Sequence, residues 1–285
     1  MDASFEDYRP YLFAIAYRML GSVMEAEDMV QEAYLRFQAS APETIQSPRA
    51  YLSTIVTRLC LDYLKSARVQ REQYIGPWLP EPLLTDSTAE PSAQVAQWES
   101  ISMAFLVLLE SLSPLERAVF LLREVFSYDY ATIASMVGRD EDACRQLFSR
   151  AKKHLVDQRP RYQSTPEAHA RLLTEFAQVL ETGETGPLTE LLVEDVTWVS
   201  DGGGKVYAAR RPIVGREAVV RLLLRLISLR PPGFEARIAE VNGLPALILS
   251  IDSQLYGVLS IETDQDKIHT FRLILNPDKL ARLQP

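Results

Sequence analysis

Apolar residues recur at helical spacing through residues 5–71 and predict three helices. The first covers residues 5–20 and ends before Gly21, a residue type that closes helices in the left-handed conformation. The second follows directly, because Ser22 can cap its first turn, and the third begins at Pro48, a residue type favoured in the first turn of a helix. The spacing therefore predicts an all-helical N-terminal domain.

The second helix has an acidic face opposite its apolar stripe. Ordinary solvation is the simpler explanation of such a face, and the pattern alone favours it over binding. The residues of this face are Glu25, Asp28, Gln31 and Glu32.

The third helix has a basic face, because Arg58 and Lys65 lie opposite its apolar stripe. Tyr51, Tyr63 and Tyr74 alternate with the bases. Aromatic rings beside positive charges are typical of sites for single-stranded nucleic acid, where unpaired bases stack on the rings. A core role is the alternative for these tyrosines, and we favour it for Tyr63.

A helix-turn-helix pattern lies in residues 112–155. Its leading helix begins at Ser113, with Glu116 placed to complete a capping box. The next helix, residues 130–137, stops at Gly138, which permits the backbone conformation of a tight turn between helices. The pattern predicts a second helical domain.

The last helix of this pattern turns a polar and basic face outward, because its apolar positions must face the other two helices. Such a face can enter the major groove of DNA. The alternative is a three-helix unit with a solvated face, and the acids at the start of the helix, which repel phosphate, favour that alternative. The outward residues are Arg145, Ser149, Lys152 and Lys153, and the acids are Asp140, Glu141 and Asp142.

Between the two helical domains, residues 76–100 lose helical periodicity and carry four prolines. The stretch also contains Trp78, whereas a plain spacer is rich in Gly and Ser or uniformly charged. We therefore expect this linker to dock on another part of the protein. A further helix is predicted over residues 93–111.

After Pro166 the pattern becomes mixed, with helices first and strands afterwards, which is typical of an α+β domain. A curved sheet over a helix makes a cone with a hollow. The predicted strands are 196–200, 206–210, 235–241, 246–250, 255–262 and 268–275, and the predicted helices are 172–180, 188–192 and 216–229.

The net charge of −8 is unusual for a DNA-binding protein, but it is unevenly distributed. Residues 49–71 and 143–161 are strongly basic, whereas residues 72–113 hold acids and no base. No apolar run is long enough to span a bilayer, and the start of the chain is acidic, so we expect a soluble cytoplasmic protein. Cys60 and Cys144 fall on apolar stripes and are predicted to be core residues, so no metal or other cofactor is expected.

These motifs resemble the extracytoplasmic-function (ECF) sigma factors. Residues 5–71 resemble region 2 of that family and residues 112–155 resemble region 4. The linker and the C-terminal part resemble the subgroup with a SnoaL-like (NTF2-like) extension. The motifs are Ala26 to Arg36, Ala50-Tyr51-Leu52 with Asp62, Leu112-Ser113-Pro114, Glu116 to Val119, Ile133-Ala134, Trp78 to Pro82, Asp201 to Lys205 and Asn276-Pro277-Asp278.

The resemblance implies a multidomain fold: two all-α sigma-factor domains and an α+β cone. The expected boundaries are 1–75 for region 2, 76–100 for the linker, 101–160 for region 4 and 166–285 for the SnoaL-like domain. The implied partners are the β and β′ subunits of the bacterial RNA polymerase core and promoter DNA.

The resemblance also assigns roles to residues. The acidic face of the second helix docks on the polymerase, the next helix opens and holds the single-stranded −10 element, and region 4 reads the −35 element as duplex. Polymerase-binding residues are Asp28, Gln31, Glu32 and Arg36. DNA-binding residues are Arg49, Tyr51, Arg58, Lys65, Arg68, Arg145, Ser149, Arg150 and Lys152.

We expect the C-terminal domain to pack on the sigma module and to limit its use of polymerase. This expectation rests on Trp78, which needs burial, and on the loop ending in Lys205, which has no evident partner in sequence. The implied regulatory residues are Trp78, Leu79, Pro80, Glu81, Pro82, Asp201, Lys205, Asn276 and Asp278.

Two other functions remain open at this level. SnoaL-like domains include enzymes that use an Asp/His pair, and this chain has only three histidines, with no spacing that singles out a site, so we expect no catalysis. The alternative is a DNA-binding protein whose cone senses an unknown small ligand or acts as an isomerase. Region 4 also departs from the family pattern at residues 143–147, which leaves the promoter sequence undefined.

Overall fold

The computed structural model describes residues 3–40, 45, 47–85, 101–158, 164–183, 186 and 188–283. They form two compact bodies: Met1–Glu72 with Phe105–Arg159, and Gln73–Ala104 with Pro160–Pro285. The helix-turn-helix therefore belongs to the same body as the N-terminal helices. The described linker residues 73–85 belong to the body of the C-terminal domain.

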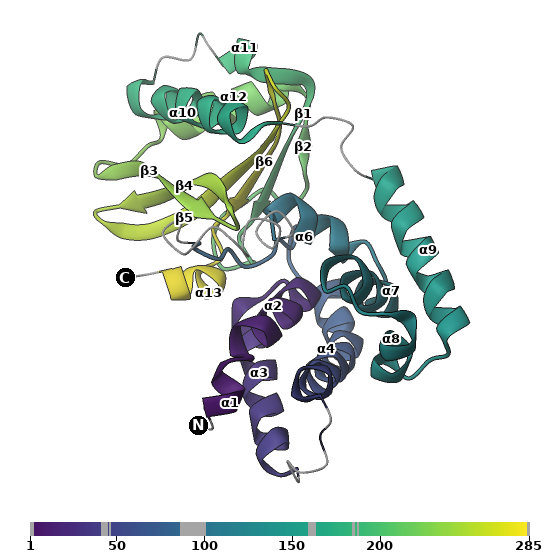
Figure 1. Cartoon of the computed structure of the whole chain (residues 1–285). Helices are drawn as coiled ribbons and strands as arrows, with labels where there is room; N and C mark the ends of the chain where they lie inside the picture. Colours follow the sequence, from purple (N-terminus) through teal and green to yellow (C-terminus); the bar gives the residue numbers. More distant parts are fainter. Residues whose placement is uncertain are drawn as a thin grey trace. The chain divides into compact units, whose positions relative to one another are not determined.

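The first half of the first body is helical, as its apolar spacing predicts (Figure 1). Gly21 closes the second of its helices with φ of 66°, and the Ser22 hydroxyl accepts a hydrogen bond from the Glu25 amide at 3.3 Å. Both predicted caps are thus confirmed. The helices are α1 (Ala3–Glu6), α2 (Arg9–Leu20), α3 (Val23–Gln38) and α4 (Pro48–Glu72).

The helix-turn-helix pattern is also confirmed. Ser113 and Glu116 form the predicted capping box, and Gly138 has φ of 67° at the turn between the last two helices. Of the helix predicted over residues 93–111, residues 93–100 lie outside the described residues. The elements are α6 (Met103–Glu110), α7 (Pro114–Phe120), the π-helical segment η2 (Leu121–Val125), α8 (Tyr130–Val137) and α9 (Glu141–Gln158).

A buried arginine joins the two halves of this body. Arg117 on α7 donates to the main-chain oxygen of Met19 at the end of α2 and pairs with Glu110, in both cases at 2.6 Å. Burial lowers the pKa of Arg117 to about 10. The cation thereby satisfies a carbonyl that the end of α2 leaves without a helical partner.

The second body is a curved six-stranded sheet with α10 and α12 on one face (Figure 1). The strand order is β2-β1-β6-β5-β4-β3, and only the β1–β6 pair is parallel among the described strands. The elements are α10 (Pro166–Thr182), α11 (Leu188–Leu191), β1 (Leu192–Asp201), β2 (Ile213–Val214), α12 (Arg216–Ser228), β3 (Phe234–Val241), β4 (Leu244–Ile251), β5 (Gln254–Thr263), β6 (Ile268–Ile274), α13 (Pro277–Leu280) and the 3-10 turn η3 (Ala281–Leu283).

Aromatic side chains fill the space between the sheet and these helices. The ring of Phe271 lies 4.8 Å from that of Phe176 and 5.3 Å from that of Trp198, and all three are buried. The arrangement of helices first and a mostly antiparallel sheet afterwards is the predicted α+β cone of the SnoaL-like type. The predicted fold class is confirmed.

One predicted strand is wrong. Residues 206–210 form a loop, and the strand in this part of the chain is the short β2. Val206 and Ala208 pack on the core, which produced the alternating pattern, but the Ala209 amide donates to the Ser200 hydroxyl at 3.0 Å instead of to a strand. The alternation of apolar and polar residues therefore indicates here which side chains pack on the core, although the segment does not pair with a strand.

Candidate polymerase-binding and DNA-binding surfaces

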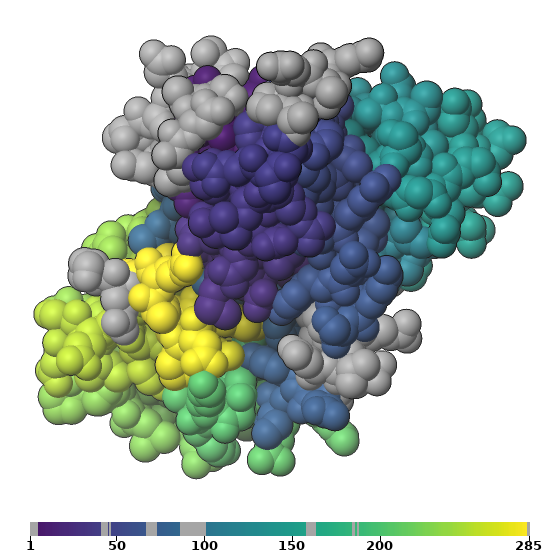
Figure 2. Space-filling model, turned by 90° about the horizontal axis from the view of Figure 1, so that it is seen from below, coloured from purple at the N-terminus to yellow at the C-terminus, as the bar shows by residue number. Residues whose placement is uncertain are grey.

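Helix α3 exposes a mixed face on the first body, whose α2 and α3 form the dark purple surface in Figure 2. Asp28 and Gln31 are exposed, and Glu32 forms an ion pair with Arg36 at 2.8 Å. The opposite side is held by ring packing, since Phe5 lies 5.0 Å from Tyr34 between ring centroids. The four predicted polymerase-binding residues thus lie off the buried stripe.

Two apolar residues complete this face, and the sequence analysis missed them. Met24 is 50% exposed and Leu35 is 51% exposed. With Asp28 and Gln31 they follow the spacing of one helical stripe. Their signal in the sequence was two apolar residues on one helical stripe that the amphipathic pattern assigns to solvent. One such residue is ordinary on a protein surface, whereas an exposed apolar patch indicates a contact surface.

Helix α4 exposes the predicted basic face. Tyr51 is 36% exposed, so it is not a core residue, which was the alternative role for this tyrosine. Arg58 and Lys65 are exposed on the same face, and Lys65 pairs with Asp62 at 2.7 Å. Arg68 lies within α4, and its side chain lies outside the described residues.

The guanidinium of Arg58 is occupied by the helix-turn-helix. It donates to the main-chain oxygen of Met136 at 2.9 Å and to that of Ser135 at 2.7 Å. Both carbonyls lie in the last turn of α8, where helical carbonyls lack partners and the helix dipole favours a cation. The contact therefore joins the predicted −10-binding helix to the predicted −35-binding domain.

A second contact between the same two parts is built from hydroxyl groups. Tyr11 donates to the Tyr128 hydroxyl at 3.0 Å, and Ser53 lies 3.0 Å from the same oxygen. Arg49, a predicted DNA-binding residue, lies over the Tyr11 ring at 4.1 Å. Burial, followed by the bond to Tyr128, raises the pKa of Tyr11, so the Tyr11 hydroxyl stays protonated.

Helix α9 turns its polar face to solvent, as predicted. Cys144, Ala151 and Leu155 are buried on the other side. Glu141 forms an ion pair with Arg145 at 2.7 Å. The carboxylate of Glu141, which was expected to repel phosphate, is therefore paired with a cation of the same helix. The exposed residues of the face are Arg145, Ser149, Arg150, Lys152 and Lys153.

In the second body, Asp201 anchors the linker. Its carboxylate is fully buried and accepts hydrogen bonds from the Tyr74 hydroxyl at 2.5 Å and from the Leu79 amide at 2.9 Å. Lys279 pairs with it at 2.7 Å and its ammonium lies 4.1 Å from the centre of the Trp78 ring. A buried carboxylate requires such compensation, so the site holds both charges and the linker together.

The linker continues along the edge of the sheet. Leu84 forms an antiparallel bridge with Val241, and the side chain of Asn242 accepts from the Leu83 amide at 3.1 Å. The Thr85 hydroxyl donates to Glu240 at 2.7 Å. Docking of the linker was expected, but no pattern in the sequence indicates that β3 or Lys279 receives it.

The glycine turn after Asp201 is tightly packed. A Cβ atom on Gly203 would lie 2.4 Å from the Asn276 side chain, and Gly203 has φ of 60°. Lys205 pairs with Asp278 at 2.6 Å, so it does have a partner within its own body. The three predicted motifs of this part of the chain thus meet at one place.

The two histidines of the second body have structural partners. His269 lies 2.7 Å from Asp264 in the turn between β5 and β6, where the Asp264 carboxylate also accepts the amides of Asp266 and Lys267. This pair stabilises the turn. His169 is buried and donates its Nε2 hydrogen to the Pro245 oxygen at 2.9 Å. Within the described part of the chain, no cluster of His, Cys, Asp or Glu could hold a metal ion.

The geometry defines a class of protein: a helical module with a helix-turn-helix and exposed basic faces, joined to an α+β domain. Among the described residues, no helix is long and apolar enough to cross a membrane. Residues 4–69 match the family model for Sigma-70 region 2, and residues 102–155 match that for Sigma-70, region 4.

Relatives cover the whole chain. It is 41% identical over 291 residues to the ECF RNA polymerase sigma factor SigJ of Mycobacterium tuberculosis, covering 98% of this chain and 93% of SigJ. It is 32% identical over 286 residues to the probable ECF RNA polymerase sigma factor SigI of the same species, covering 100% and 96%. The crystal structure of SigJ matches with a TM-score of 0.79 at 33% identity, over 99% of this chain and 98% of that one.

This chain belongs to the ECF RNA polymerase sigma factors. Its function is therefore promoter recognition and transcription initiation together with RNA polymerase.

Proposed function

We propose that α3 binds the polymerase core, that α4 holds the single-stranded −10 element and that α9 reads the −35 element. The observation that carries this division is the exposure of one distinct polar face on each helix. The α3 face combines acids with Met24 and Leu35, whereas the faces of α4 and α9 are basic. A mixed acidic and apolar face suits a protein partner, and a basic face suits phosphate.

The test is run-off transcription with core polymerase and the upstream DNA of the gene itself. A specific transcript above the core-alone level is expected. Core-level transcription by a protein that is folded, as judged by circular dichroism, would reject the proposed function.

The α+β body acts in this proposal as a built-in regulator. Its Asp201 site fixes the linker at Tyr74 and Leu79, and Asn242 fixes it again at Leu83. The linker connects the two DNA-binding regions, so anchoring it restricts the separations that these regions can adopt. Release of the linker would then widen the range of conformations open to the polymerase.

A catalytic role is not part of the proposal. The space between the sheet and the helices is occupied by Phe176, Trp198 and Phe271, and the Asp264–His269 pair lies in a turn. A small ligand of the cone remains a prediction, for which a pH–rate profile on ketone substrates and ligand-induced thermal shifts are the tests. The partners are the polymerase core and promoter DNA, and the site of action is the cytoplasm.

A further inference from the structure

The second body contains a strongly basic stretch that the proposed function does not use. Between Asp201 and Glu217 the chain carries four cations and no acid, in a protein of net charge −8. The cations are Lys205, Arg210, Arg211 and Arg216. Most of them lie on the loop between β1 and β2, which we call the basic loop (residues 205–211).

Two of these cations lack partners among the described residues. Lys205 pairs with Asp278, and Arg216 donates to the Val193 oxygen at 3.4 Å. Arg210 and Arg211 are exposed, and no described residue forms a hydrogen bond or ion pair with either. Their charges are therefore available to an outside anion.

An aromatic ring lies on the same loop in an unusual state. Tyr207 is 98% exposed, whereas the other exposed apolar and aromatic side chains of the described residues are at most 66% exposed. An aromatic ring left almost wholly in water gains no burial energy in the folded protein. It is available to stack on a planar partner.

The basic loop is held in shape beneath these side chains. The amides of Lys205 and Val206 both donate to the Gly202 oxygen, at 3.0 and 3.2 Å, and the Ala209 amide donates to Ser200. A Cβ atom on Gly202 would lie 2.6 Å from the Val206 oxygen, so only glycine fits there. A fixed loop presents its ring and cations with little ordering cost on binding.

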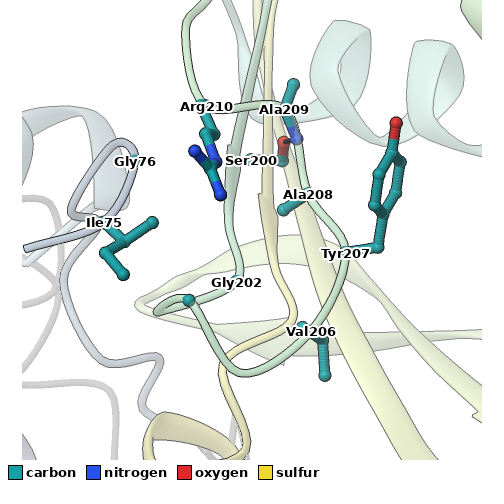
Figure 3. Close-up of a pocket in the computed structure, with 10 residues that line it drawn as sticks. Ile75, Gly76, Ser200, Gly202, Val206, Tyr207, Ala208, Ala209 and Arg210 are labelled. Carbon is teal, nitrogen blue, oxygen red and sulfur yellow. Dashed lines mark hydrogen bonds between the residues drawn. The ribbon is translucent and has the colours of Figure 1, made fainter.

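Figure 3 shows Arg210 beside a pocket of about 390 Å³ between the basic loop and the linker. Ile75 and Gly76 form the linker wall, and Ser200 lies at the back. The side chain of Tyr207 extends from the other side of the loop. The ring and the guanidinium are therefore presented on two sides of one short loop.

We propose that the basic loop binds single-stranded nucleic acid, with an unpaired base stacked on Tyr207 and backbone phosphates at Arg210 and Arg211. An exposed ring and unpaired cations on one short loop fit this partner, because duplex DNA keeps its bases stacked internally. An acidic protein surface would match the charges, but a single strand offers both a phosphate and a planar base at every nucleotide. The inference rests on the proposed function, since a sigma factor works where promoter DNA is opened.

The first test measures fluorescence anisotropy of a labelled oligothymidine with the full-length protein over a range of salt concentrations. Tyr207→Ala should weaken binding at least about five-fold, the lower end for loss of one stacked base. Arg210→Ala with Arg211→Ala should lower the slope of log affinity against log salt by about 1.4, at about 0.7 for each phosphate. Arg237→Ala, an exposed arginine at the opposite edge of the sheet, is the matched control and should change neither.

The second test maps a photocrosslink from an iodouracil oligonucleotide to the peptide that holds Tyr207. Unchanged affinity and an unchanged salt slope in all loop variants would overturn the inference. It would also be overturned if the loop variants still bound oligothymidine normally but no longer bound core polymerase in an assay without DNA. Run-off transcription by the wild-type protein separates the two proposals. If the wild-type protein gives a specific transcript and the loop variants bind oligothymidine normally, only the role of the basic loop is rejected. If the wild-type protein gives no specific transcript, the proposed function is rejected.

Discussion

Arg58 on α4 donates a hydrogen bond to the main-chain oxygen of Met136 at the end of α8, at 2.9 Å. The same guanidinium reaches the Ser135 oxygen at 2.7 Å. The two bonds use two of the five N–H donors of the guanidinium, so three donors remain. Arg58 can therefore contact the −10 strand through its remaining donors, or with all of them once its contact with α8 is broken.

Replacement of Arg58 therefore separates binding from opening. Arg58→Ala should lower the permanganate reactivity of −10 thymines by about ten-fold, in line with loss of one charge-assisted contact. Binding to a −35 duplex should stay unchanged. Tyr128→Phe is the control, because it removes hydroxyl bonds between the same two parts but leaves Arg58 intact.

Tyr128→Phe should lower the melting temperature by a few degrees and preserve opening. Equal opening defects in both variants would mean that the defect comes from loosening of the helical body, and the role of Arg58 in DNA binding would be rejected.

The α3 face should decide the affinity for core polymerase. Asp28→Lys with Glu32→Lys should abolish binding, and Leu35→Ser alone should weaken it about ten-fold, because an exposed leucine at the centre of a contact loses its burial. All three side chains lie off the buried stripe of α3, so the helix should stay folded. Pull-down of core polymerase measures the effect, with Glu167→Lys on α10 as a control for charge reversal elsewhere on the surface. Wild-type affinity in the charge-reversed variant would refute this surface.

Helix α9 should control the −35 element separately. Arg145→Ala should weaken binding to the −35 duplex by about ten-fold. Binding to fork-junction DNA, whose −10 element is already single-stranded, should be unaffected. Glu141→Gln provides a comparison, because it removes the ion pair between Glu141 and Arg145 but keeps the Arg145 side chain. A gel shift with duplex and with fork-junction DNA gives both values. If Arg145→Ala also lost binding to the fork-junction DNA, a role limited to the duplex would be contradicted.

Local rules explain what could be predicted from the sequence. Ser113 with Glu116, Gly138 and Ser22 act within one helical turn, and each occupies the predicted cap. The predicted strand 206–210 was wrong because an alternating pattern indicates burial of one side, and Val206 and Ala208 are partly buried against the core without pairing to a neighbouring strand.

Long-range pairings were beyond such rules. Lys279 lies far from Asp201 and from Trp78 in sequence, and only the folded sheet brings the three side chains together. The exposed Leu35 was also missed, because a single apolar residue off the stripe carries little weight in a periodic pattern.

His169 should make the stability of the α+β body depend on pH. Burial lowers the pKa of His169, and its bond to the Pro245 oxygen only partly opposes this. The unfolded chain therefore binds the proton more readily, so the free energy of unfolding should fall as the pH drops below about 6.5. Urea unfolding at pH 7.5 and 5.5 measures the difference, and His169→Gln should reduce it. An equal loss in wild type and variant would assign the effect to other groups.

The anchored linker provides the last prediction. Asp201→Asn keeps the shape of the side chain but leaves Lys279 buried without its counter-charge, which should destabilise the α+β body by about 3 kcal/mol. The hydrogen bonds from Tyr74 and Leu79 should also weaken, so the linker should become accessible to protease between residues 74 and 85. Lys205→Glu is the comparison, because its ion pair with Asp278 is more than half exposed on both sides and contributes less than about 1 kcal/mol.

If the anchored linker limits the sigma module, Asp201→Asn should expand the protein in hydrodynamic measurements and raise the yield of run-off transcript at temperatures where it stays folded. Trp78→Ala should act in the same direction, since its ring lies against the same ammonium group. Both variants are compared with wild type at equal concentrations of core polymerase. A variant that is protease-sensitive in the linker, yet gives the wild-type transcript yield and radius, would show that anchoring has no regulatory effect and that the α+β domain does not control the sigma module.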